Sequence, residues 1–249
     1  MEILLTNDDG IDSPGLILLA EALRQAEHRV VVIAPDIDRS GVSHAISFLD
    51  EPCKLSKRGE DIWACSGTPV DCVVMGLLGA IPGFEGYAPG LVISGINKGA
   101  NLGTDLIYSG TAAAARQAGM AGFPGLALSL IQGETWYWET AVSFVCDKLM
   151  EMKNFRKPDT FVNVNIPNRV LPPEGLVPAF PARRRYHDTI DRYQSLSGEI
   201  YCFARAGTTS AEPQAGSDHD TVLKNFASMS AVCIYPAAWE DAAAGKEGA

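Results

Sequence analysis

The sequence has 249 residues, enough for one sizeable hydrophobic core, and 47% of them are hydrophobic and 20% charged, as in ordinary globular proteins. Its formal net charge of −10 argues against binding to a nucleic-acid duplex or to an anionic membrane, because both need surplus Lys and Arg. The six cysteines are scattered without a CxxC pair, which predicts free thiols and a cytoplasmic location.

Short apolar segments alternate with helical patterns through the first two thirds of the chain. Strands are expected at residues 3–6, 29–34, 91–94, 125–130 and 161–166. Helices are expected after Ser13-Pro14, after Thr68-Pro69, over residues 111–119 and around residues 135–150. This alternation predicts an α/β fold with a Rossmann-like, mostly parallel sheet and helices on both faces.

Three polar loops follow three of the predicted strands. They cover residues 7–10, 35–43 and 95–110. Ligands of such sheets bind beyond the carboxyl ends of the strands, so all three loops are expected at one edge of the sheet.

The pattern changes after residue 166. A basic run at residues 183–185 is followed by strand-like segments at residues 199–203 and 228–235, with a polar stretch between them. We therefore expect a Rossmann-like catalytic core at residues 1–166 and a β-hairpin-rich oligomerisation segment at residues 167–249 that returns a strand to the core. The segment is expected to cross to a second subunit. A hairpin folded back on its own core is the alternative.

Asp8 and Asp9 are adjacent carboxylates at the end of the first predicted strand. Two such groups repel each other, and a divalent cation with a preference for oxygen ligands, such as Mg²⁺ or Mn²⁺, makes the pair favourable. A solvated turn in which one carboxylate caps a helix is the alternative.

The loop at residues 95–111 contains four glycines and ends in Ser109-Gly110-Thr111 before a helix. Backbone N–H groups and hydroxyls at a helix start favour a phosphate, although no Walker motif is present. A long structural turn is the alternative.

Ser40, in the loop at residues 35–43, offers a hydroxyl to a metal or a phosphate, while an ordinary turn explains Arg39 and Ser40 equally well. His44 is more typical of a structural residue than of a catalyst.

Five blocks occur in order along the chain. They are TNDDGI at 6–11, the loop from Ala34-Pro35 to Arg39-Ser40-Gly41, SGTPVDCV at 66–73, SGINKGANLG at 94–103 and YSGT at 108–111. Together they resemble the SurE (survival protein E) family of 5′/3′-nucleotidases, with family-like spacing up to about residue 166. Beyond that point the resemblance is looser. Arg116 also departs from it, since an acidic residue is expected there.

The resemblance implies one divalent metal cation per subunit, Mg²⁺ or Mn²⁺, with ligands at Asp8, Asp9, Ser40 and Asn97. It also implies a cytoplasmic homodimer or homotetramer. The activity implied is that of a metal-dependent phosphohydrolase, a 5′-nucleotidase acting on nucleoside monophosphates. Asp8 or Asp9 is then expected to serve as the catalytic base. Asn101, Ser109, Gly110 and Thr111 are expected to hold the phosphate.

Two other functions are the alternatives. One is a general phosphomonoester or polyphosphate hydrolase, which the sequence barely separates from a nucleotidase. The other is a non-catalytic nucleotide-binding regulatory protein on the same fold, which would not need the Asp8, Asp9, Ser40 and Asn97 set.

Overall fold

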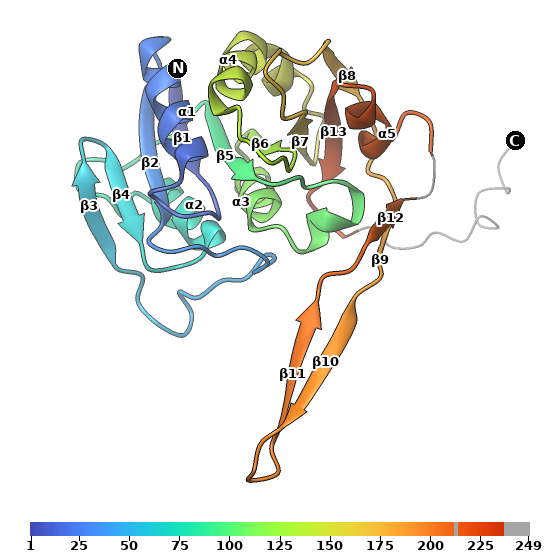
Figure 1. Ribbon diagram of the computed structural model, residues 1–249. Coiled ribbons are helices and arrows are strands. Elements are labelled where there is room, and N and C mark those ends of the chain that lie inside the picture. Colours follow the sequence, from blue (N-terminus) through green and yellow to red (C-terminus); the bar gives the residue numbers. More distant parts are fainter. Residues whose placement is uncertain (212–213, 237–249) are drawn as a thin grey trace, which may run out of the picture.

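A computed structural model describes residues 1–211 and 214–236, so the end of the predicted C-terminal segment lies outside the described residues. Its centre is a nine-stranded sheet (Figure 1). In spatial order the strands are β3 (Leu55–Gly59), β4 (Ile62–Cys65), β2 (Arg29–Pro35), β1 (Glu2–Thr6), β5 (Leu91–Lys98), β6 (Gly125–Leu130), β7 (Thr160–Ile166), β13 (Ala227–Cys233) and β8 (Leu176–Pro178).

Most neighbours in the sheet are parallel. The pairs β4–β2, β2–β1, β1–β5, β5–β6 and β6–β7 all run in the same direction. Within this nine-stranded sheet, the pairs β3–β4 and β7–β13 are antiparallel, and β8 runs parallel to β13. The predicted α/β class with a mostly parallel sheet is therefore confirmed.

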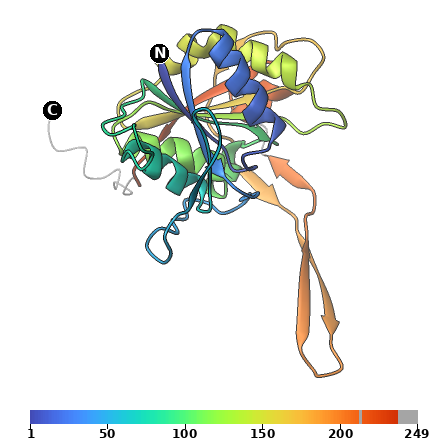
Figure 2. The ribbon, with the colours of Figure 1, turned by 90° about the vertical axis from the view of Figure 1, so that its left-hand side faces the viewer.

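Helices cover both faces of the sheet (Figure 2). Helices α1 (Pro14–Gln25) and α4 (Trp138–Asn154) pack on one face, together with Ile3 and Leu5 of β1. Helices α2 (Pro69–Leu77) and α3 (Gly110–Met120) pack on the other, against Leu4. Successive strand side chains point to opposite faces, so both sides of β1 are buried.

The start of each helix follows from local chemistry. Thr68 accepts a hydrogen bond from the Asp71 N–H, Asp71 accepts one from the Thr68 N–H, and Pro69 occupies the first turn of α2. The side chain of Ser109 accepts the Ala112 N–H at 3.0 Å and caps α3. At α1 the predicted cap is different, because the Ser13 hydroxyl accepts from the Asn7 side chain rather than from the helix.

The C-terminal part of the chain leaves the core and returns to it. Strand β9 (Arg184–Tyr186) pairs with β12 (Thr209–Ala211), and between them β10 (Thr189–Gln194) and β11 (Ile200–Arg205) form an antiparallel hairpin. The hairpin projects far from the sheet (Figures 1 and 2). The chain then forms the short helix α5 (Asp218–Leu223) and enters the sheet as β13.

The order of the central strands brings the three polar loops together. Strands β2, β1 and β5 are neighbours and parallel, so their carboxyl ends lie side by side. The expectation that these loops share one edge is confirmed. The third loop begins later than predicted, because β5 continues to Lys98 and carries Asn97 within the strand. A 3₁₀ turn, η1 (Gly103–Ile107), occupies part of it.

Strands β3 and β4, at one side of the sheet, were not predicted from the sequence. They are five and four residues long, and β3 alternates poorly between apolar and polar residues. In the described part of the chain, no helix is both long and apolar enough to cross a membrane.

Candidate active site

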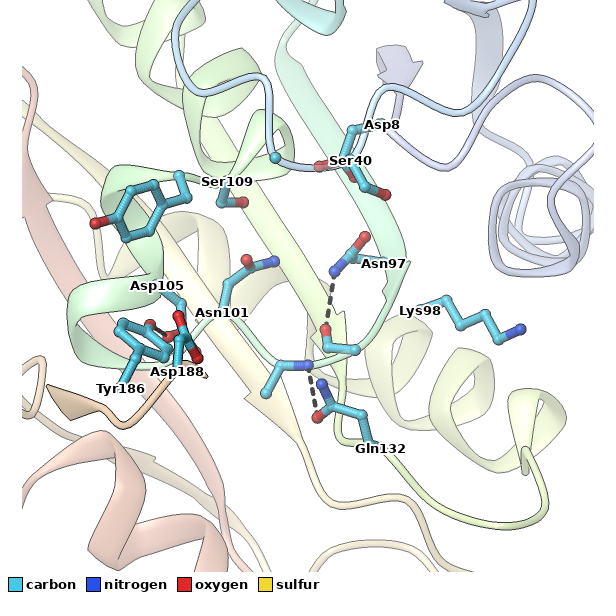
Figure 3. Close-up of a pocket in the computed structure, with 14 residues that line it drawn as sticks. Asp8, Ser40, Asn97, Lys98, Asn101, Asp105, Ser109, Gln132, Tyr186 and Asp188 are labelled. Atoms are coloured by element: carbon cyan, nitrogen blue, oxygen red, sulfur yellow. Dashed lines mark hydrogen bonds between the residues drawn. The ribbon is translucent and has the colours of Figure 1, made fainter. Parts of the chain in front are cut away.

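A cavity of about 560 Å³ lies at the shared edge of the sheet (Figure 3). Five of the residues singled out from the sequence line it: Asp8, Ser40, Asn97, Asn101 and Ser109. They come from the ends of β1 and β5, the loop after β2, the loop after β5 and the start of α3. A cavity of this size fits a small-molecule ligand, for which about 300–1,000 Å³ is typical.

Asp8 lies two residues after the end of β1 and is 3% exposed. Its two carboxylate oxygens accept hydrogen bonds from Thr111, one from the backbone N–H at 3.0 Å and one from the hydroxyl at 2.5 Å. Burial raises the pKa of Asp8 above its ordinary value, and the two bonds from Thr111 oppose that rise. Asp8 is thus a fixed carboxylate in a position that penalises its negative charge.

Asp9 lies on the other side of the chain from Asp8 and lines a neighbouring cavity of about 400 Å³. One of its oxygens accepts the backbone N–H of Lys98 at 2.8 Å. Burial raises the pKa of Asp9 to about 6, with a smaller contribution from the charges of Asp8 and Asp38, while the Lys98 N–H opposes the rise. The two carboxylates are therefore close enough to repel each other.

Ser40 and Asn97 approach the cavity from opposite sides. The Ser40 hydroxyl donates to Asp38 at 2.6 Å, which leaves its oxygen with lone pairs for another partner. The Asn97 amide nitrogen donates to the Gly99 carbonyl at 2.9 Å, and its side-chain oxygen is on the side that faces Asp8 and Ser40 (Figure 3).

The chemistry of these groups fits a divalent cation such as Mg²⁺ or Mn²⁺. Asp8, Asp9, Ser40 and Asn97 offer only oxygen atoms, and a positive ion would relieve the penalty that burial places on the two carboxylates. Over residues 1–211 and 214–236 there is no group of three or more His, Cys, Asp and Glu side chains placed to hold a metal. A set of two carboxylates, one hydroxyl and one amide matches a hard cation rather than zinc.

At the start of α3, Gly110 and Thr111 contact Asp8 and do not line the cavity. Ser109 lines the cavity, but Gly110 lies against the Asp8 side chain, and a Cβ atom there would be 2.9 Å from the Asp8 Cβ. Both donors of Thr111 are taken by Asp8. Of the three residues expected to hold a phosphate at this helix, the structure brings only Ser109 to the cavity wall.

Asn101 is held by a buried polar network. Its backbone N–H donates to Asn165, its side-chain nitrogen donates to Ser129, and its carbonyl accepts from both Asn163 and Asn165, all at 2.8 to 3.0 Å. Asn163 and Asn165 were missed from the sequence. Two asparagines at alternate positions of an otherwise apolar strand were the available signal, because a buried amide requires partners.

The far wall of the cavity is formed partly by the C-terminal segment, which the sequence did not predict. Asp105 of η1 forms an ion pair with Arg184 and accepts the hydroxyl of Tyr186. Burial raises the pKa of Tyr186 above its usual range, and the bond to Asp105 adds to this effect. Tyr186 and Asp188 both line the cavity, and so does Tyr108.

Three other residues considered from the sequence lie outside the cavity. The His44 ring contacts the side chain of Gln117 at 3.0 Å. Arg39 donates to the Ser66 carbonyl, which holds the loop after β2 against β4. Arg116 lies over the ring of the buried Phe161 at 5.4 Å, and it does not line the cavity.

Comparison with known proteins agrees with this architecture. The family model for Survival protein SurE matches residues 3–187. The 5′-nucleotidase SurE of Citrifermentans bemidjiense is 37% identical over 241 residues, covering 94% of this chain and 93% of that protein. The 5′-nucleotidase SurE of Geotalea daltonii is 38% identical over 234 residues, covering 92% and 91%.

A solved structure gives the same result in three dimensions. The crystal structure of the SurE protein from Aquifex aeolicus superimposes with a TM-score of 0.81 at 35% identity and covers 94% of each chain. The matched residues include every segment that lines the cavity as far as Tyr186. This chain therefore belongs to the SurE family.

Proposed function

We propose that this chain is a 5′-nucleotidase, a metal-dependent phosphohydrolase that releases phosphate from nucleoside 5′-monophosphates. The observation that carries the proposal is the convergence of Asp8, Ser40, Asn97 and Ser109 from four separate segments on one cavity. The relatives named as 5′-nucleotidases, which align with nearly the whole chain, support it.

In this proposal Asp8, Asp9, Ser40 and Asn97 hold one divalent cation per subunit, Mg²⁺ or Mn²⁺. Such a cation polarises a phosphoryl group and lowers the pKa of bound water. Asp8 has the more rigid position, since both of its oxygens are bonded to Thr111. The positive end of α3 also points at this carboxylate.

Asp9 is the better candidate for the base that accepts a proton from the attacking water. Within the described residues, its side chain accepts one hydrogen bond, from the Lys98 N–H, and its other oxygen is available. Ser109 and Asn101 are proposed to orient the phosphate oxygens, which is supported by the position of both in the cavity wall. Groups fixed before the substrate binds are the ones that stabilise a transition state most effectively.

Phosphate release from a panel of nucleoside 5′- and 3′-monophosphates, ribose 5-phosphate and polyphosphate tests the proposal. We expect release from the 5′-monophosphates with Mg²⁺ or Mn²⁺, none with EDTA, and a loss of about a hundredfold or more in Asp8→Asn and Asp9→Asn. Asp147→Asn, on α4 and outside both cavities, is the matched control. Full activity in EDTA or in both site variants would disprove the proposal.

The assembly is proposed to be a homodimer, or a homotetramer built from dimers. The β10–β11 hairpin exposes Tyr193, Tyr201 and Phe203 on one face and Ile190 and Ile200 on the other. A lone two-stranded hairpin is marginally stable in water. A second copy of this chain is the proposed cover for these side chains.

The location is proposed to be the cytoplasm. All six cysteines are free, and Cys202 and Cys233 are exposed. Exposed free thiols fit a reducing compartment.

A further inference from the structure

The cavity extends well beyond the groups that would hold a metal and a phosphate. Asp8 and Ser40 lie at one end, and Tyr186 and Asp188 lie at the other (Figure 3). Tyr108, the residue before Ser109, also lines the cavity. A substrate whose phosphate lies at Asp8 and Ser109 therefore has a distal part that reaches the two tyrosines.

The two tyrosine rings form a pair. Their centroids are 6.3 Å apart and their planes are inclined by 78°, an edge-to-face arrangement. Tyr108 is 55% exposed and Tyr186 is 39% exposed, so each retains open aromatic surface. Aromatic surface of this kind at a cavity wall is a platform for a planar ligand group.

Hydrogen bonds hold the backbone of Tyr108 and the ring of Tyr186 in place. The Tyr108 N–H donates to the Asp105 carbonyl at 3.0 Å, and its own carbonyl accepts the Ser43 N–H at 2.9 Å. The Tyr186 hydroxyl donates to the Asp105 carboxylate, which is also paired with Arg184. A platform fixed in advance loses little conformational entropy when a ligand binds.

The charges at this end favour a neutral ligand group over a second phosphate. Asp188 presents a carboxylate there, one oxygen of which accepts the Gly207 N–H at 3.1 Å. Lys98 also lines the cavity, but its ammonium group extends away from it and lies 5.5 Å from the Trp136 ring (Figure 3). This end of the cavity therefore favours a planar, aromatic and uncharged group.

We propose that Tyr108 and Tyr186 form the nucleobase subsite of this protein, and that stacking on them favours purine over pyrimidine nucleotides. The inference rests on the proposed function and adds the residues that select the base. Purines stack more strongly because their two fused rings cover more aromatic surface. Base–aromatic stacking lost on substitution by alanine changes affinity by about 5- to 150-fold.

The test compares AMP, UMP and ribose 5-phosphate as substrates of the full-length protein with Mn²⁺. We expect kcat/KM for AMP relative to ribose 5-phosphate to fall by about tenfold or more in Tyr108→Ala and Tyr186→Ala, mainly through KM. The preference for AMP over UMP should shrink in parallel. Tyr108→Phe keeps the ring and should keep both ratios.

Tyr235→Ala is the matched control, since Tyr235 is 53% exposed and does not line the cavity. Calorimetric titration with AMP and with ribose 5-phosphate provides a readout independent of turnover. If the wild type prefers AMP and both alanine variants keep that preference, the proposed nucleobase subsite is disproved, while the proposed nucleotidase activity is not. If the wild type hydrolyses AMP and ribose 5-phosphate equally well, the subsite is wrong and a general phosphomonoesterase is favoured. If AMP is neither bound nor hydrolysed, the proposed function fails as well.

Discussion

Thr111 holds Asp8 with two hydrogen bonds, one from its backbone N–H at 3.0 Å and one from its hydroxyl at 2.5 Å. Both residues are almost fully buried, and they are separated by 103 positions in the chain. The contact joins the end of β1 to the first turn of α3. It gives Thr111 the role of positioning a proposed metal ligand.

Replacing Thr111 by Val removes the hydroxyl donor while keeping the shape of the side chain. A hydrogen bond to a charged group contributes about 1.5–3 kcal/mol, so we expect lower stability, weaker Mn²⁺ binding and about tenfold lower kcat. Thr111→Ser retains the hydroxyl and should restore all three. Denaturant unfolding, calorimetric titration with Mn²⁺ and steady-state kinetics measure them. Unchanged Mn²⁺ affinity in Thr111→Val would contradict the positioning role.

Replacing Gly110 by Ala should displace Asp8. The added Cβ would lie 2.9 Å from the Asp8 Cβ and 3.0 Å from one of its carboxylate oxygens. We expect a destabilisation of about 1–3 kcal/mol, typical of overpacking, together with a loss of phosphate release. Gly90→Ala is the control, because its nearest neighbour would be 3.6 Å away. Denaturant unfolding and phosphate release are measured on both variants. Equal stability and equal activity in Gly110→Ala and Gly90→Ala would contradict the expected displacement of Asp8.

His44 should make the protein less stable on acidification. Burial lowers the pKa of His44 below its usual value of 6.5, and the charge of Arg116 lowers it further, while the bond to Gln117 opposes the shift. The unfolded chain therefore takes up a proton at a higher pH than the folded protein does. Stability from this residue is present above the unfolded value and is lost as the pH falls toward the folded one.

The test compares unfolding free energies at about pH 7.5 and about pH 5.5, across the range in which histidine titrates. We expect His44→Gln to lose less stability than the wild type over this interval. His187→Gln, at an exposed histidine, is the control. An equal loss in the wild type and in His44→Gln would rule His44 out as a source of the pH dependence.

The hairpin should determine the oligomeric state. Light scattering is expected to give at least twice the 26.6 kDa of one chain. Phe203→Asp places a charge on the aromatic face and should shift the protein toward monomers on dilution. Leu171→Asp introduces the same side chain at an exposed apolar position outside the hairpin and is the control. A wild type that stays monomeric at high concentration would refute the homodimer and place the segment in its own subunit.

The sheet and its functional edge could be predicted from the sequence because the signals are local. An apolar strand ending in Asp8-Asp9 and a Gly-rich loop ending before α3 each lie within a few residues, and parallel topology brings their ends together. The far wall could not be predicted in this way. The Asp105–Arg184 pair joins residues 79 positions apart, and no periodicity in the sequence reports such a contact.

The roles of Gly110 and Thr111 were likewise beyond the sequence. A glycine and a hydroxyl at a helix start are compatible with a phosphate or with a carboxylate of the protein itself. The structure shows that Gly110 and Thr111 contact the carboxylate of Asp8, because the end of β1 lies beside the start of α3. Arg184 presents a similar case, since its charge is directed to Asp105 rather than to a ligand.

The far wall and the hairpin belong to one uninterrupted stretch of chain. Tyr186 and Asp188 line the cavity, and β10 begins at Thr189, the next residue. On the return path β12 pairs with β9, so the base of the hairpin is closed by the strand that carries Tyr186. A second subunit that binds the hairpin would therefore contact the same segment of chain that forms part of the cavity wall. In the proposed dimer, assembly and substrate selection would therefore depend on the same segment, and a substitution in the hairpin is expected to affect both.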